Sequence, residues 1–220
     1  MSHRVVVRSR HSRESVLNNR VGELVDEGHH AETRRDAKTA SLCYNGAMAY
    51  LVLAYPELEK SDFEWIQEYR KKNDLLYYAV VEPHITLVFA LGGLGKDEFV
   101  EEVKNQIVGF SAFDATFNVA TINQDHSGKY FHEFLVPDIG YSNIVKLHDR
   151  LYADKFADSL RLDIDYIPHI GIGNSKVSQQ SKRRVDEVNA KNISIKGRVA
   201  SVDIVEYKSG KITSIEKVAL

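Results

Sequence analysis

Hydrophobic and polar positions alternate between strand-like and helix-like spacing from residue 47 onward. Apolar runs at 47–56 and 84–91 predict strands, the first of which ends at a proline. Segments 61–73 and 95–110 have helical spacing, and the former begins with a serine suited to cap a helix. The first half of the chain therefore predicts the order strand, helix, strand, helix.

The second half resembles the first and ends in additional strands. Its predicted segments are a hairpin of strands at 114–124 and 130–138, a helix at 141–158, a strand at 167–173, a helix at 176–190, and closing strands at 197–208 and 211–220. Hairpin turns between successive strands indicate mainly antiparallel pairing. The pattern predicts an α+β fold of two related lobes of mainly antiparallel sheet with flanking helices.

The first 42 residues differ from the rest of the chain. They contain no proline or aromatic residue and are rich in Arg, Glu, Asp and His, with one amphipathic helical pattern around 14–27. We interpret 1–42 as a polar extension that is partly helical or disordered, with a regulatory or partner-binding arm as the alternative. The two-lobed domain is expected over 43–220.

Composition limits the classes of function. The 29 basic and 31 acidic residues give a net charge of −2, so no long nucleic-acid footprint is expected, although a local cluster can bind a phosphorylated ligand. Cys43 is the only cysteine, which excludes an internal disulfide and a cysteine-based zinc site. No apolar stretch of membrane-spanning length and no secretory signal is found, so we expect a cytoplasmic protein without a membrane partner, and a monomer as the simplest oligomeric state.

Two stretches of the chain read almost alike: VVEPHITLVF at 80–89 and DYIPHIGIGN at 165–174. Because side chains alternate along a strand, His84 and Thr86 share one face while the aliphatic residues between them point into the core. His169 and Gly171 share the corresponding face of the second strand. Each strand starts at a proline, and the two histidines are 85 residues apart, which indicates that both face one cleft.

With this pair of motifs the sequence resembles the 2H phosphoesterase superfamily, which includes bacterial RNA 2′,3′-cyclic phosphodiesterases also called 2′–5′ RNA ligases. The superfamily carries an H-x-[ST] motif in each of two pseudo-symmetric lobes that face each other across a groove, so the resemblance implies a catalytic groove between the two lobes of this chain. Here His84-Ile85-Thr86 matches that motif, whereas His169-Ile170-Gly171 keeps the histidine and lacks the hydroxyl. The resemblance covers about 45–220.

The resemblance implies acid and base catalysis by His84 and His169 on a 2′,3′-cyclic phosphate, at an RNA end or on a small nucleotide. Two side chains that titrate near neutrality suit this exchange, and each such group contributes about 10²–10⁴-fold. Thr86 would bind a non-bridging phosphate oxygen and stabilise the pentavalent centre. Neither a metal nor another cofactor is expected in this reaction, and a reversible 2′–5′ RNA ligase activity is compatible with it.

Gly171 allows three interpretations. Loss of a hydroxyl donor can reduce catalysis by about 10²–10³-fold. Alternatively, the glycine lets the phosphate approach the backbone and use an N–H group. In the third interpretation, Ser175 or Lys176 replaces the missing group. Because both histidines are retained, we favour an active enzyme.

Candidate substrate contacts lie outside the two motifs. Tyr130 and Phe131, which follow the turn at 125–129, are candidate platforms for a stacked base, and Tyr50 in the first strand is a comparable one. Lys129 in the turn could reach a phosphate. Together with Gly171, these four residues form the predicted substrate-binding set.

Two other classes of function remain open. A non-catalytic module that binds RNA or nucleotides on the same scaffold would explain Gly171. A histidine metal hydrolase is disfavoured because the residues beside both histidines include no acidic partner. The glycine-rich stretch at 90–96 lacks the first glycine and the final Ser or Thr of a phosphate-binding loop, so it is not interpreted as one.

Overall fold

The computed structural model describes residues 48–220, so the predictions for the N-terminal extension lie outside the described residues. Two sheets, which we name sheet A and sheet B, form its centre, and every strand pair in them is antiparallel. Sheet A has the order β3 (Ile85–Leu91), β1 (Ala49–Ala54), β8 (Ser201–Lys208), β9 (Lys211–Ala219). Sheet B has the order β2 (Glu57–Leu58), β7 (Ile195–Val199), β4 (Phe113–Gln124), β5 (Phe131–Ile139), β6 (Ile170–Ser175).

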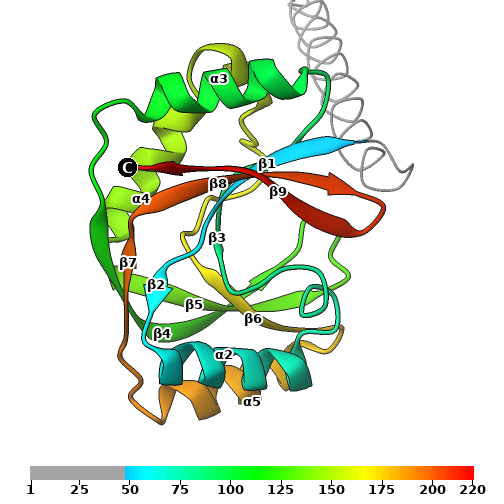
Figure 1. The fold of residues 1–220 in the computed structure, drawn as a ribbon. Coiled ribbons are helices and arrows are strands. Elements are labelled where there is room, and N and C mark those ends of the chain that lie inside the picture. Colours follow the sequence, from blue (N-terminus) through cyan, green and yellow to red (C-terminus); the bar gives the residue numbers. More distant parts are fainter. Residues whose placement is uncertain (1–47) are drawn as a thin grey trace, which may run out of the picture. The chain divides into compact units, whose positions relative to one another are not determined.

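The helices lie on the outer sides of the two sheets (Figure 1). They are α2 (Lys60–Asn73), α3 (Lys96–Ile107), α4 (Tyr141–Leu151), the 3₁₀ helix η1 (Asp154–Ser159) and α5 (Ser178–Asn189). Helices α2 and α5 pack on sheet B, and α3 and α4 lie beside sheet A. The predicted α+β class with antiparallel sheets and flanking helices is confirmed.

The two sheets are not built from consecutive halves of the chain. Sheet A combines β1 and β3 with the two C-terminal strands, and the single strand predicted over 197–208 divides at Ala200 into β7 in sheet B and β8 in sheet A. Two helices pack against strands that are distant from them in the sequence. Helix α2, which follows β2 of sheet B and leads into β3 of sheet A, packs against β6, whereas α4, which lies between β5 and β6 of sheet B, packs against β3.

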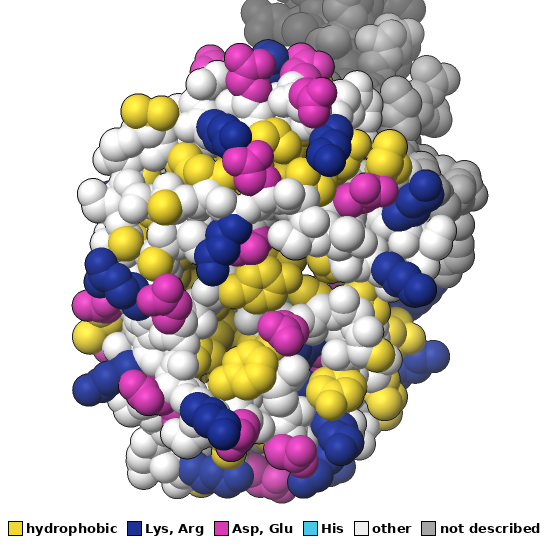
Figure 2. All heavy atoms as spheres, viewed as in Figure 1, with side chains coloured by type: hydrophobic (Ala, Val, Ile, Leu, Met, Phe, Trp, Pro, Cys, Tyr) yellow, Lys and Arg dark blue, Asp and Glu magenta, His cyan; other side chains and the backbone are white. Residues whose placement is uncertain are grey.

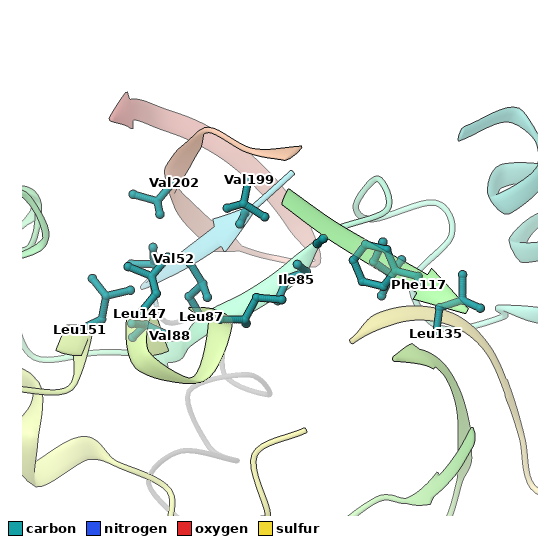
Figure 3. Close-up of a cluster of buried hydrophobic side chains, with 14 of the residues drawn as sticks. Val52, Ile85, Leu87, Val88, Phe117, Leu135, Leu147, Leu151, Val199 and Val202 are labelled. Atoms are coloured by element: carbon teal, nitrogen blue, oxygen red, sulfur yellow. The ribbon is translucent and has the colours of Figure 1, made fainter. Parts of the chain in front are cut away.

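Buried aliphatic side chains fix the two histidine-bearing strands from behind. Ile85 and Leu87 on β3 are each 1% exposed, and Ile170 and Ile172 on β6 are fully buried. Figure 3 shows Ile85 and Leu87 beside Val52 of β1 and the side chains of α4. Burial of one such side chain contributes about 1.5–3 kcal/mol, so the hydrophobic core holds both strands firmly.

Both histidine-bearing strands are edge strands, β3 in sheet A and β6 in sheet B. The main chain of β3 is bound by two tyrosine hydroxyl groups. The Phe89 N–H donates to Tyr152 Oη at 3.0 Å, and Tyr166 Oη donates to the Thr86 carbonyl at 3.0 Å. These bonds satisfy edge groups that would otherwise be open to pairing, and they fix the main chain at Thr86.

Several helix boundaries differ from the prediction, and two of these differences affect how the chain continues. Helix α2 begins at Lys60 with Glu59 as its N-cap, not at the serine. The helix predicted over 141–158 ends at Leu151, and Asp154 has a φ of 45°, so a single helix cannot continue into η1. Within the described part of the chain, no helix is long and apolar enough to cross a membrane.

Candidate active site

His84 and His169 are held in the same way. Each stands immediately before its strand, and each Nδ1 lies within hydrogen-bonding distance of the carbonyl oxygen two residues earlier. The distances are 2.7 Å from His84 to Glu82 and 2.5 Å from His169 to Ile167. Because a carbonyl oxygen only accepts, these contacts assign the hydrogen of the neutral ring to Nδ1. Each Nε2 therefore keeps a lone pair that can take up a proton.

The charges of the histidines influence one another. Burial is the main cause that lowers the pKa of His169 to about 4. The hydrogen bond to the Ile167 carbonyl opposes this shift, and positive charge on His84 and His132 acts in the same direction as burial. Burial also lowers the pKa of His84 to about 4, where Arg70 acts in the same direction and Asp74 opposes it. The structure therefore gathers the two predicted histidines and His132, which was not predicted, at one site.

Thr86 and Gly171 occupy different surroundings. Thr86 is half-buried and pairs with Leu53 of β1. Gly171 pairs with Phe134 of β5, and a Cβ built at Gly171 would have no heavy atom within 4 Å. The space in which the second hydroxyl of an H-x-[ST] motif would stand is therefore open.

Neither residue suggested to replace the missing hydroxyl lies free beside Gly171. Ser175 Oγ donates to Gln180 Oε1 at 2.6 Å and accepts the Val177 N–H at 3.0 Å, so it stabilises the start of α5. Lys176 Nζ lies over the ring of Tyr130, 5.5 Å from its centroid. Neither of these two side chains therefore stands in for the hydroxyl at this position.

A row of rings follows β5 to His169. Tyr130, His132 and Phe134 alternate along the strand, with 6.5 Å and 6.0 Å between successive ring centroids. Phe134 then stacks on His169 with 3.4 Å between centroids, and Tyr77 stacks on His132 at 6.2 Å. The two-residue period starting at Tyr130 would have identified His132 and Phe134 from the sequence.

The other predicted substrate contacts lie elsewhere. Phe131 is on the opposite face of β5 from Tyr130, and its carbonyl accepts from Ser181 of α5. Tyr50 is 5% exposed and packs on Phe99 at 5.4 Å, within the core. Lys129 is exposed in the β4–β5 turn. Of the proposed binding set, Tyr130 and Gly171 are the residues that lie with the histidines or with the row of rings.

A buried ionic network supports the loop that carries Tyr77. Arg70 is 1% exposed and donates to Asp74 Oδ2 through Nε at 3.1 Å and Nη2 at 3.0 Å. Asp74 Oδ1 accepts from Asn174 of β6 at 2.6 Å and from the Tyr77 N–H at 3.0 Å. The end of α2 is thereby joined to the strand that carries His169. Residues 48–220 contain no group of three or more His, Cys, Asp or Glu side chains placed to hold a metal ion.

The sequence also matches a known family along most of its length. The profile of the 2′-5′ RNA ligase superfamily matches residues 56–211, which include both histidine motifs. The chain belongs to the 2′-5′ RNA ligase superfamily. This confirms the resemblance drawn from the motifs, and it supports a phosphoesterase that acts on RNA or nucleotide phosphates.

Two solved structures illustrate what the chain is similar to. Escherichia coli LigT complexed with 3′-AMP shares 14% identity and a TM-score of 0.52, over 79% of this chain and 98% of LigT. Kluyveromyces marxianus Usb1 shares 8% identity and a TM-score of 0.47, over 78% of this chain and 98% of Usb1. No curated protein sequence matches the chain. At this identity the likeness to LigT establishes the superfamily fold.

Proposed function

We propose that this member of the 2′-5′ RNA ligase superfamily is a metal-independent phosphodiesterase that opens 2′,3′-cyclic phosphates at RNA ends or on nucleotides. The observation that carries the proposal is the matched orientation of His84 and His169. Both donate from Nδ1 to a main-chain carbonyl and keep Nε2 as a proton acceptor. Two such nitrogens are what a reaction with one base and one acid requires.

The reaction would proceed by in-line displacement at phosphorus. The Nε2 of one histidine takes a proton from water while the water oxygen forms a new bond to phosphorus. The bond from phosphorus to one ribose oxygen breaks, and the protonated Nε2 of the other histidine donates a proton to that oxygen. The product is a ribose phosphomonoester with an adjacent free hydroxyl group.

The low histidine pKa values are consistent with this scheme once substrate is bound. In the free protein both pKa values are lowered to about 4, so both rings are neutral at pH 7. A phosphate anion between the rings favours the protonated form and raises these pKa values. Binding of the cyclic phosphate would therefore help to protonate the histidine that acts as the acid.

Other groups would bind the phosphate and a neighbouring base of an RNA end. The Thr86 hydroxyl would donate to a non-bridging oxygen, from a strand that Tyr166 holds at the Thr86 carbonyl. The row of rings from Tyr130 to Phe134 offers stacking surfaces next to His169. A base stacked on such a ring contributes about 1–3 kcal/mol to binding.

A non-catalytic module that binds RNA or nucleotides is the second candidate. The open space at Gly171 favours it, because one of the two expected phosphate-binding hydroxyls is missing and neither Ser175 nor Lys176 replaces it. Binding in such a module would use Thr86 and the row of rings without chemistry.

Hydrolysis of the four 2′,3′-cyclic nucleoside monophosphates, and of an oligonucleotide ending in a cyclic phosphate, tests the proposal. Wild type, His84→Ala and His169→Ala would be compared in the presence of EDTA. Turnover by wild type is expected to survive the chelator and to fall by about 10²–10⁴-fold in each variant. His126→Ala, which changes an exposed histidine in the β4–β5 turn, is the matched control and should retain wild-type turnover.

Each alternative predicts a different result. Binding of the oligonucleotide by wild type without turnover of any substrate would replace the proposal by the binding module. Turnover that EDTA abolishes would point to a metal hydrolase instead. Circular dichroism and thermal unfolding of both histidine variants check that the loss does not come from misfolding.

A further inference from the structure

A cavity of about 440 Å³ lies on sheet A beside the histidine site. Its walls are partly apolar and partly polar, and they include Val81, Val205, Ile212, Tyr55, Asp203 and Lys217. On the face drawn in Figure 2, hydrophobic side chains gather in the middle with charged side chains around them. Apolar walls with a few polar groups are typical of sites for small organic ligands.

The register of sheet A places the cavity on the same face as the catalytic residues. Thr86 of β3 pairs with Leu53 of β1, Leu53 pairs with Asp203 of β8, and Asp203 pairs with Lys217 of β9. Directly opposite residues in antiparallel strands share a face, so this row runs from the phosphate-binding hydroxyl into the cavity. Two strand spacings separate Thr86 from Asp203, a distance of about 10 Å.

Tyr55 and Glu82 connect the cavity with His84. Tyr55 lines the cavity, and its ring centroid lies 6.1 Å from that of His84. Glu82 also lines the cavity, and its carbonyl oxygen holds His84 Nδ1. A molecule in the cavity would therefore lie next to the reacting phosphate, at the distance that one nucleoside spans.

Asp203 is the distinctive group in this cavity. The residue is 8% exposed, and within residues 48–220 its Oδ2 atom is buried without a hydrogen-bond partner. Burial raises the pKa of this carboxyl, while the positive charge of Lys217 across the strand pair lowers it. Buried polar atoms are almost always bonded, so an unbonded carboxylate oxygen on a residue that lines a ligand-sized cavity indicates a ligand that brings hydrogen-bond donors.

We propose that this cavity binds the nucleobase attached to the reacting ribose phosphate, and that Asp203 selects bases with an exocyclic amino group. The inference rests on the proposed function. Guanine offers two adjacent N–H donors and suits a carboxylate best, whereas cytosine and adenine offer one amino group each. The single N–H of the uracil edge lies between two carbonyl oxygens, which repel a carboxylate. Val81, Val205 and Ile212 would contact the faces and rim of the base.

The test compares kcat/KM for 2′,3′-cyclic GMP and 2′,3′-cyclic UMP in wild type and in Asp203→Asn. Wild type should prefer the guanosine substrate by about 10–100-fold, the usual discrimination of a paired hydrogen-bonding edge. Asp203→Asn should remove most of that preference by lowering kcat/KM for the guanosine substrate. It should change kcat/KM for the uridine substrate by less than about threefold. The matched control is Glu206→Gln, which also replaces a carboxylate by an amide. Glu206 lies three residues further along β8 and does not line the cavity, so kcat/KM for both substrates should stay unchanged.

The outcomes separate this inference from the proposed function. Turnover of both substrates with equal kcat/KM, and an equal effect of Asp203→Asn on both, would overturn the base subsite and leave the phosphodiesterase intact. If wild type cleaves neither substrate, calorimetric binding of guanosine 3′-monophosphate and uridine 3′-monophosphate decides the subsite alone. A guanosine preference that is lost in Asp203→Asn supports it, and equal or absent binding overturns it.

Discussion

The ring of Phe134 stacks on the ring of His169, with 3.4 Å between centroids and 18° between planes. His84 has no equivalent contact in the described structure, because its nearest ring, Tyr55, is 6.1 Å away and tilted by 55°. The two histidines therefore share a hydrogen-bonding pattern but differ in packing. Phe134 restricts His169 and keeps water from one face of its ring.

Phe134→Leu should impair catalysis through His169. Loss of the stacked ring lets the imidazole rotate, and small misplacements of a catalytic group can cost about 10²-fold in rate. We expect kcat to fall by about 10-fold or more with little change in KM. The matched control is Phe131→Leu, on the opposite face of the same strand, which should leave kcat unchanged.

The same variant should change the titration of His169. Leucine admits water to the ring, so the pKa of His169 should move from about 4 toward 6.5, which NMR titration would measure. A drop in kcat with no movement of this pKa would contradict the shielding role given to Phe134.

The lowered histidine pKa values predict an acidic pH optimum. The pH profile of kcat/KM reports the protonation states of the free enzyme. The reactive form has one neutral and one protonated histidine, so the maximum of kcat/KM lies between their two macroscopic pKa values. Because burial lowers both values to about 4, the maximum of kcat/KM should lie below pH 6.5. Bound phosphate raises both values, so the kcat profile should be displaced to higher pH than that of kcat/KM.

Stability should fall in mild acid for the same reason. A histidine whose pKa is lower in the folded than in the unfolded state favours folding fully above pH 6.5, and this contribution is lost as the pH falls toward 4. Urea unfolding at pH 7 and pH 5 should show a smaller free energy at pH 5. In His84→Gln/His169→Gln the difference between the two pH values should shrink, and an unchanged difference would mean that these histidines titrate normally.

Gly171→Thr should fold and should accelerate the reaction. A Cβ at this position meets no heavy atom within 4 Å, and the new hydroxyl would restore the H-x-[ST] motif. We expect kcat to rise by about 10-fold or more, since one donor to the transition state is worth about 10²–10³-fold when well placed. A slower enzyme would show instead that the phosphate uses the space above the glycine backbone.

Gly173→Thr on the same strand is the structural contrast. A Cβ at Gly173 would collide with the carboxylate of Glu133 and crowd Asn73 at 3.3 Å. This variant should lower the thermal unfolding temperature, whereas Gly171→Thr should not. Equal destabilisation by both substitutions would contradict the open space assigned to Gly171.

Asp74→Ala should strongly destabilise the fold. The side chains of Arg70 and Asp74 are 2% and 4% exposed, so removal of the carboxylate leaves a buried guanidinium without its charged partner. Such a loss costs about 3–5 kcal/mol in the free energy of unfolding, measured with urea. The exposed pair Lys60 and Glu64 lies on the same helix with the same spacing, and Glu64→Ala should change that free energy by at most about 1 kcal/mol.

The sequence by itself was enough to predict the α+β class and the superfamily, and it singled out His84, Thr86 and His169 as the candidate site. These features depend on local patterns: a strand alternates its side chains whatever surrounds it, and a proline marks where the strand starts. The histidine pair was found because the same short pattern occurs twice. The same alternation predicts that His132 and Phe134 share a face with Tyr130. Phe131, which was chosen as the second substrate contact, lies on the opposite face of β5.

Tertiary structure decided which elements meet. No local pattern shows that 197–208 divides between two sheets, or that α2 packs against β6 and α4 against β3, because these contacts form between segments distant in the sequence. The position of Tyr50 in the core depends on Phe99 of α3, and that of Asp203 beside the histidine site depends on the register of four strands. Burial likewise sets the histidine pKa values near 4, since desolvation exists only once the chain has folded.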